Sequence, residues 1–174
     1  MKYDVKYNEQ TVRERIAKTA NALRKQGVLT EDTVYLVMLN GGLWFAAHLF
    51  DALGGVGNKV FMIKGHSYTG VERGEFLWDC LPDEQDIAGR KLVILDDICD
   101  SGATINIINR FFKTKAQQIT FVTLLERATR QLDADVQLYS CIKDDSQDFF
   151  VGCGLDDNEA SRFLPYIGVL QVEN

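Results

Sequence analysis

The stretch from Lys91 to Thr104, which reads KLVILDDICDSGAT, constrains the fold of this chain more than any other segment. Its first five residues form a nearly continuous apolar run, which is typical of a strand buried on both faces of a parallel sheet. Asp96 and Asp97 follow that run directly, and apolar residues resume at helical spacing from Ile105 onward. The stretch therefore predicts a strand, an acidic tip, a small polar loop and a helix, in that order.

The polar loop of this stretch predicts an anion-binding site. Residues 100–104 (DSGAT) contribute backbone N–H groups and two hydroxyls at the start of the predicted helix. The first N–H groups of a helix have no intrahelical partner and the helix dipole is positive there, so a phosphate is favoured. Because Asp96 and Asp97 would repel a phosphate, we expect them to contact sugar hydroxyls or a divalent cation that bridges to the ligand.

Strand and helix patterns alternate along the rest of the chain. Residues 8–26 carry Val12, Ile16, Ala20 and Leu23 on one face of an amphipathic helix. The other predicted elements are strands at 34–39, 59–63, 91–95, 118–125 and 136–142 and helices at 43–53 and 105–113. Such alternation predicts an α/β fold, a parallel sheet with helices on its faces.

Between residues 64 and 89 the pattern lapses. That segment is charged and broken by glycine, with one short apolar clump at Phe76, Leu77 and Trp78. We expect a long excursion that forms a small hairpin, and excursions of this length inside a domain tend to be functional lids.

Composition limits the function. The 174 residues suit a single domain, and a hydrophobic fraction of 46% supplies a sizeable core. The formal net charge of −6 argues against nucleic acid or an anionic membrane as the main partner, since clustered Lys and Arg drive such binding. Four cysteines without CxxC spacing and no apolar signal segment predict a reducing, cytoplasmic setting with free thiols and no structural zinc. No apolar run approaches the roughly 20 residues that span a bilayer.

Four segments together resemble a known family. The run ILDDICDSGAT resembles the phosphoribosyl-diphosphate (PRPP) motif of type I phosphoribosyltransferases. The loop Leu39–Gly42, the tripeptide His66-Ser67-Tyr68 and the tail FFVGCGLDDNEASRFLPYIGVL, from Phe149 to Leu170, narrow the resemblance to the hypoxanthine–guanine branch. In that family the loop that resembles Leu39–Gly42 contains a non-proline cis peptide and binds pyrophosphate through backbone N–H groups.

The resemblance implies the architecture of the whole chain. It predicts a parallel twisted sheet flanked by helices, with a small hood and a flexible loop. All of 1–174 would form one phosphoribosyltransferase domain, with a flexible lid at 64–89 and the hood and base-binding region at 126–174.

The resemblance also implies roles for individual residues. Asp100 would be the catalytic base that removes the proton from purine N7. The residues implied for the ribose and 5-phosphate of PRPP are Asp96, Asp97, Asp100, Ser101, Gly102, Ala103 and Thr104, and those for its pyrophosphate are Asn40, Gly41 and Arg162. The implied base-binding residues are Arg127, Phe149, Phe150 and Asp156, the flexible-loop residues are Ser67 and Tyr68, and the magnesium ligands are Asp156, Asp96 and Asp97.

Three positions depart from the family pattern. Asn40 replaces a Lys or Arg, which removes a charge from the pyrophosphate loop, and Asp96 replaces a Glu that is one methylene longer. Arg127 replaces the Lys that donates to the 6-oxo group of the purine. A forked guanidinium is not equivalent to an ammonium, and it can reach a second oxygen on the base, which would favour xanthine. The choice among hypoxanthine, guanine and xanthine stays open.

The sequence thus predicts a purine salvage enzyme. It would convert a 6-oxopurine base and PRPP to the nucleoside 5′-monophosphate and pyrophosphate, with Mg²⁺, as a homodimer or homotetramer. One alternative is a non-catalytic regulatory protein that senses PRPP or a nucleotide on the same fold, but the acidic chain lacks a basic face for RNA. An aspartyl-phosphate phosphatase or receiver domain fits less well, because residues 96–100 lack an Asp-x-Asp-x-Thr arrangement.

Overall fold

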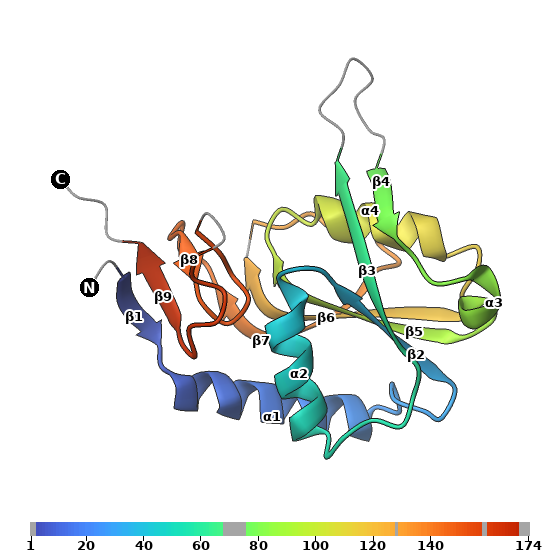
Figure 1. The fold of residues 1–174 in the computed structure, drawn as a ribbon, viewed down its shortest axis with the longest axis horizontal. Coiled ribbons are helices and arrows are strands. Elements are labelled where there is room, and N and C mark those ends of the chain that lie inside the picture. The colour runs from blue at the N-terminus through green and yellow to red at the C-terminus, as the bar shows by residue number, and fades with distance from the viewer. Residues whose placement is uncertain (1–2, 68–75, 128, 158–159, 171–174) are drawn as a thin grey trace.

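Two β-sheets organise the computed structural model, which describes residues 3–67, 76–127, 129–157 and 160–170 (Figure 1). The larger sheet has six strands in the order β4-β3-β2-β5-β6-β7. Its parallel strands are β2 (Thr33–Met38), β3 (Val60–Ser67), β5 (Lys91–Cys99), β6 (Gln118–Arg127) and β7 (Gln137–Asp144). Strand β4 (Phe76–Cys80) pairs antiparallel to β3 at the edge. The predicted parallel α/β fold is confirmed.

Helices cover both faces of the larger sheet (Figure 1). They are α1 (Glu9–Lys25), α2 (Gly42–Ala52), α3 (Glu84–Ile87) and α4 (Ala103–Phe112). Strand β2 is buried along its whole length because successive side chains alternate between two cores. Tyr35 and Val37 join the core under α1 and α2, whereas Val34 and Leu36 join the core under α4.

Helix α1 forms where the sequence predicts it. Asn8 caps its first turn by accepting a hydrogen bond from the backbone N–H of Thr11 over 2.9 Å. Its buried face holds the four apolar residues that were expected there. The other predicted strands and helices are confirmed within a few residues, except that β3 and β5 continue four residues further. Asp96 and Asp97 therefore belong to the end of β5 itself.

The second sheet is a small hood built from both ends of the chain (Figure 1). Strand β9 (Ile167–Leu170) lies between β1 (Tyr3–Tyr7) and β8 (Phe150–Val151), in antiparallel pairing with each. Strand β1 was not predicted, since its five residues carry no clear alternation of apolar and polar side chains. The hood therefore includes residues 3–7 as well as residues from the region 126–174.

The excursion at 64–89 contains the predicted hairpin, formed by β3 and β4, and the short helix α3, which was not predicted. All four cysteines are free thiols, as expected. Within the described residues, no helix combines the length and the apolar character needed to cross a membrane.

Substitution of Phe112 tests the contribution of the core under α4 to stability. Its side chain is fully buried, so Phe112→Ala should lower the free energy of unfolding by about 3–5 kcal/mol through lost burial and the remaining cavity. Phe163→Ala is the matched control, because that side chain is 74% exposed and its loss should change stability by less than about 0.5 kcal/mol. Urea unfolding measures both, and equal losses in the two variants would contradict this assignment of the core.

Candidate active site

The candidate site lies at the C-terminal end of β5. Residues 96–105 line a pocket of about 250 Å³ there, which spans the end of the strand, the loop and the first turn of α4. Ligands collect at this end of parallel strands because connecting loops and helix N-termini gather there. The pocket contains seven residues that the sequence predicts for ribose and 5-phosphate, namely Asp96, Asp97, Asp100, Ser101, Gly102, Ala103 and Thr104.

The loop of this pocket is held in a tight shape by a neighbouring segment. Gly102 has φ +86° and precedes the first turn of α4, where Ser101 Oγ accepts a hydrogen bond from the Ala103 N–H over 3.3 Å. A Cβ atom on Gly102 would lie 2.5 Å from the carbonyl oxygen of Gln131, so only glycine fits there. The backbone N–H of Gln131 donates to the Ser101 carbonyl over 2.9 Å. Ser101, Ala103 and Thr104 remain exposed at the N-terminus of α4, which suits an anion.

Asp96 and Asp97 form a tight carboxylate pair. The backbone N–H of Asp97 donates to Asp96 Oδ1 over 2.9 Å. Burial and the adjacent Asp97 carboxylate raise the pKa of Asp96 well above its ordinary value. Burial also raises the pKa of Asp97, although its hydrogen bonds and the positive charge of Arg162 oppose the rise. A pair of this kind accepts hydrogen bonds from hydroxyl groups or binds a cation readily.

Three chain segments meet at the Asp97 side of the pocket. A Cβ atom on Gly41 would lie 1.9 Å from Asp97 Oδ2, and one on Gly154 would lie 2.2 Å from the Gly41 carbonyl oxygen. The peptide between Leu39 and Asn40 is cis, as the resemblance implies. The loop after β2 therefore packs against the Asp97 side chain at the end of β5, and the turn after β8 packs against the backbone of that loop.

Arg162 and Asp156 extend this corner. Arg162 Nη1 donates to the Gly154 carbonyl over 3.0 Å, and Nη2 donates to Asp156 Oδ2 over 2.6 Å. The other oxygen, Asp156 Oδ1, is buried and has no hydrogen-bond partner among the described residues. An orphaned buried carboxylate oxygen signals a missing partner.

The carboxylate oxygens at this corner fit a Mg²⁺ ion that takes most of its ligand atoms from a bound substrate. Across the described ranges, no three His, Cys, Asp or Glu side chains form a cluster that could hold a metal by themselves. Mg²⁺ needs no such cluster, because it commonly uses one or two carboxylates together with substrate phosphates and water. The free oxygen of Asp156 supplies one such ligand.

Beside the pocket, Asp100 contacts Arg127 at the end of β6. Asp100 is 65% exposed, and its Oδ1 lies 2.7 Å from Nε of Arg127, which is only 14% exposed. Arg127 lies over the ring of Phe150, with 4.8 Å from Cζ to the ring centroid. Phe150 is buried in the core, whereas Phe149 is 52% exposed, so core packing does not account for Phe149.

Beyond the pocket lining, the structure brings several of the predicted residues together in two groups. The first contains Gly41, Asp97, Asp156 and Arg162, and the second contains Asp100, Arg127 and Phe150. Ser67 ends β3, and Tyr68 lies outside the described residues.

Two further residues at the site were missed by sequence reasoning. Gly154 lies against Gly41, and the spaced glycines at 152 and 154 were a signal for a tight turn. Lys6 contacts the segment that holds Arg127, and no motif in the sequence points to it.

Comparisons with known proteins agree with this geometry. The family model for the phosphoribosyl transferase domain matches residues 7–158. The hypoxanthine-guanine phosphoribosyltransferase of Bacillus subtilis is 31% identical over 98% of this chain and 96% of its own length. Among solved structures, a hypoxanthine phosphoribosyltransferase from Staphylococcus aureus superposes with a TM-score of 0.83 at 25% identity, covering 97% of this chain and 91% of that one.

A second solved structure points the same way. The hypoxanthine phosphoribosyltransferase from Trypanosoma cruzi, in complex with the product IMP, gives a TM-score of 0.80 at 25% identity and covers 96% of this chain and 93% of its own. This chain therefore belongs to the phosphoribosyltransferase family, in its hypoxanthine–guanine branch.

Proposed function

We propose that this protein transfers the 5-phosphoribosyl group of PRPP to a ring nitrogen of a 6-oxopurine and releases pyrophosphate. The observation that carries the proposal is the 2.7 Å contact between Asp100 Oδ1 and Arg127 Nε. This contact joins the loop at residues 100–104, which suits a sugar phosphate, to the end of β6, which suits a flat base. A carboxylate that stands between two substrates is well placed to take a proton from one as it reacts with the other.

PRPP would occupy the pocket at the end of β5. The N–H groups of residues 100–104 and the hydroxyls of Ser101 and Thr104 would hold the 5-phosphate. Asp96 and Asp97 would accept hydrogen bonds from the ribose hydroxyls. Their negative charge would also stabilise the ribose ring as it becomes oxocarbenium-like during cleavage of the anomeric bond.

The pyrophosphate would lie at the corner formed by Gly41, Asp156 and Arg162. Backbone N–H groups of Asn40 and Gly41 would donate to it, and Arg162 supplies the positive charge that Asn40 lacks. Bound Mg²⁺ would neutralise the negative charge that develops on the leaving group. Asp156 would hold it through its unpartnered Oδ1, together with oxygens of the pyrophosphate, while Asp96 and Asp97 would face the ribose hydroxyls.

The purine would lie against the exposed ring of Phe149, next to Phe150 and Arg127. Asp100 would remove the proton from N7 as N9 attacks the anomeric carbon. Three of the five guanidinium N–H donors of Arg127 are taken by Asp100 and two backbone carbonyls. The remaining two can donate to oxo groups of the base, so xanthine stays a candidate beside hypoxanthine and guanine.

A substrate screen tests the reaction. Hypoxanthine, guanine, xanthine, adenine and uracil are each incubated with PRPP and Mg²⁺, and nucleotide formation is followed by chromatography. We expect turnover of at least one 6-oxopurine and none of uracil. Turnover of adenine or uracil alone would refute the 6-oxopurine assignment, and PRPP binding without any turnover would favour the regulatory alternative.

Asp100→Asn tests the general base. The amide cannot accept the purine proton, so kcat should fall by about 100-fold or more while PRPP binding changes little. Asp51→Asn, at an exposed position in α2, serves as the control and should keep full activity. Steady-state kinetics and PRPP titration measure both effects, and an unchanged kcat would remove Asp100 from this role.

Asp96→Asn tests how much the carboxylate pair lowers the free energy of unfolding. Because the pKa of Asp96 is raised in the folded protein, folding is most favourable when Asp96 is protonated, and stability falls as pH rises above its ordinary value of 3.8. Asparagine keeps the acceptor oxygen without the charge, so the variant should be more stable at pH 7 by about 1 kcal/mol or more. The gain should shrink toward pH 4.

Thermal unfolding from pH 4 to pH 8 measures this difference. Glu31→Gln, at an exposed position, should show no comparable pH-dependent gain. An Asp96→Asn protein that is less stable than the parent at pH 7 would contradict the assigned electrostatic penalty.

A further inference from the structure

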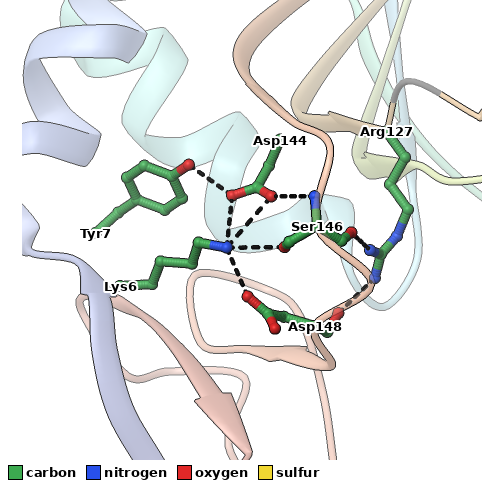
Figure 2. A network of polar contacts seen from close by, with 6 residues as sticks. All are labelled: Lys6, Tyr7, Arg127, Asp144, Ser146 and Asp148. Atoms are coloured by element: carbon green, nitrogen blue, oxygen red, sulfur yellow. Dashed lines mark hydrogen bonds and ion pairs between the residues drawn. The ribbon is translucent and has the colours of Figure 1, made fainter.

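The turn that joins β7 to β8, residues 144–148, is held from two sides by two cations (Figure 2). Lys6 of β1 contacts its side chains, and Arg127 at the end of β6 contacts its backbone. We call these residues the 144–148 turn. Because one segment is held by both cations, its shape links the hood to the base-binding edge of the site.

Lys6 uses its ammonium group to gather three side chains of this turn. Its Nζ lies 3.0 Å from Asp144 Oδ2, 2.7 Å from Ser146 Oγ and 2.6 Å from Asp148 Oδ2. An ammonium has three N–H donors, so each can point to one of these side chains. The Lys6 side chain is only 27% exposed, and Asp144 is 5% exposed, so solvent screens this contact less than a surface ion pair.

Arg127 holds the same turn from the other side. Its Nη1 donates to the Ser146 carbonyl over 2.6 Å and its Nη2 donates to the Asp148 carbonyl over 2.7 Å (Figure 2). Because the guanidinium is planar and rigid, fixing both Nη atoms also fixes Nε, which lies 2.7 Å from Asp100 Oδ1. The positions of two carbonyls therefore decide where Arg127 presents its remaining donors.

Neighbouring side chains balance the negative charges of the 144–148 turn. Burial alone would raise the pKa of Asp144, but hydrogen bonds from Ser146, Tyr7 and Lys6 hold it below its usual range. Tyr7 donates to Asp144 Oδ2 over 2.6 Å, and burial together with this bond raises the pKa of Tyr7 to about 12. Removing Lys6 would leave Asp144 and Asp148 repelling each other across the turn.

We propose that Lys6 is a positioning residue: by fixing the 144–148 turn it sets the placement of Arg127, so that the N-terminal strand takes part in the choice of purine. The contacts alone support the positioning of Arg127 by Lys6. The effect of Lys6 on the choice of purine rests on the proposed function. Lys6 lies 5.2 Å from the centroid of the Phe150 ring, on which Arg127 also packs, so its place in the hood is well defined.

Kinetics of three variants test the effect on the base. Lys6→Met should raise KM for the favoured 6-oxopurine about tenfold while the KM for PRPP stays within about twofold. Lys6→Arg keeps the charge and should recover at least half of the loss. Lys115→Met is the matched control, since Lys115 is 29% exposed, pairs with Glu84 and lies 4.7 Å from the centroid of the Phe111 ring, away from the site.

A double-mutant cycle shows whether Lys6 acts through Arg127. If it does, Lys6→Met should change the base KM by less than about twofold in the Arg127→Lys background. Full additivity would overturn the proposal, as would a Lys6→Met protein that folds normally and keeps the parent KM for the base. If Lys6→Met does not fold, Ser146→Ala with Asp148→Asn replaces it in the same cycle.

Crystal structures separate this proposal from the proposed function. In Lys6→Met, Arg127 should lose at least one of its bonds to the Ser146 and Asp148 carbonyls, whether or not the parent protein turns over any purine. An unmoved Arg127 would refute the positioning role even in an active enzyme. A displaced Arg127 in a protein without transferase activity would support positioning and refute the assigned reaction.

Discussion

The close approach of three backbone segments at the C-terminal end of β5 is the constraint on which the site depends. Gly41 and Gly154 lie where any side chain would overlap Asp97 or the neighbouring backbone. Absent side chains let backbone N–H groups reach a ligand directly, which a multiply charged diphosphate requires. The sheet makes this possible, because β2 and β5 are adjacent parallel strands and their final loops emerge at the same edge.

At this edge of the sheet, the polar groups proposed to bind ligands lower the stability of the folded protein. Desolvation of the half-buried pair Asp96 and Asp97 raises the pKa of both carboxyls, and Asp156 keeps one buried oxygen without a partner among the described residues. Such features destabilise a ligand-free protein. The two apolar cores that flank the sheet offset the penalty, since β2 and β5 bury long runs of aliphatic side chains on both faces. A rigid sheet therefore supports an end whose polar groups are poorly satisfied within the protein itself.

The sequence predicted the parts of the fold that local patterns encode. Strand β5, its polar loop and helix α4 are continuous in the chain, and their apolar spacing and turn chemistry agree with each other. Strand β1 could not be predicted, because it is stabilised by pairing with β9, some 160 residues away, with Tyr3 opposite Leu170. Lys6 was missed for the same reason.

The contact between Asp100 and Arg127 could be predicted once the order and register of the strands were known. Cys99 pairs with Glu126 in the parallel register of β5 and β6, so the next residues of the two strands are neighbours. The sequence supplied both residues through a family resemblance but not the register that joins them. Strand order and register are long-range properties, and a single sequence encodes them only weakly.

The contacts of Arg127 and the network around Lys6 belong to one arrangement. The three N–H donors of a lysine radiate from one atom, so a lysine at position 127 could not reach Asp100 and two carbonyls that are met by three separate nitrogens of the guanidinium. An arginine can, but its fork is useful only where the acceptors are fixed at the right spacing. The 144–148 turn provides those acceptors, and Lys6 and Tyr7 hold its side chains from behind. Under the proposed positioning role, the placement of the Arg127 guanidinium depends on a strand near the start of the chain.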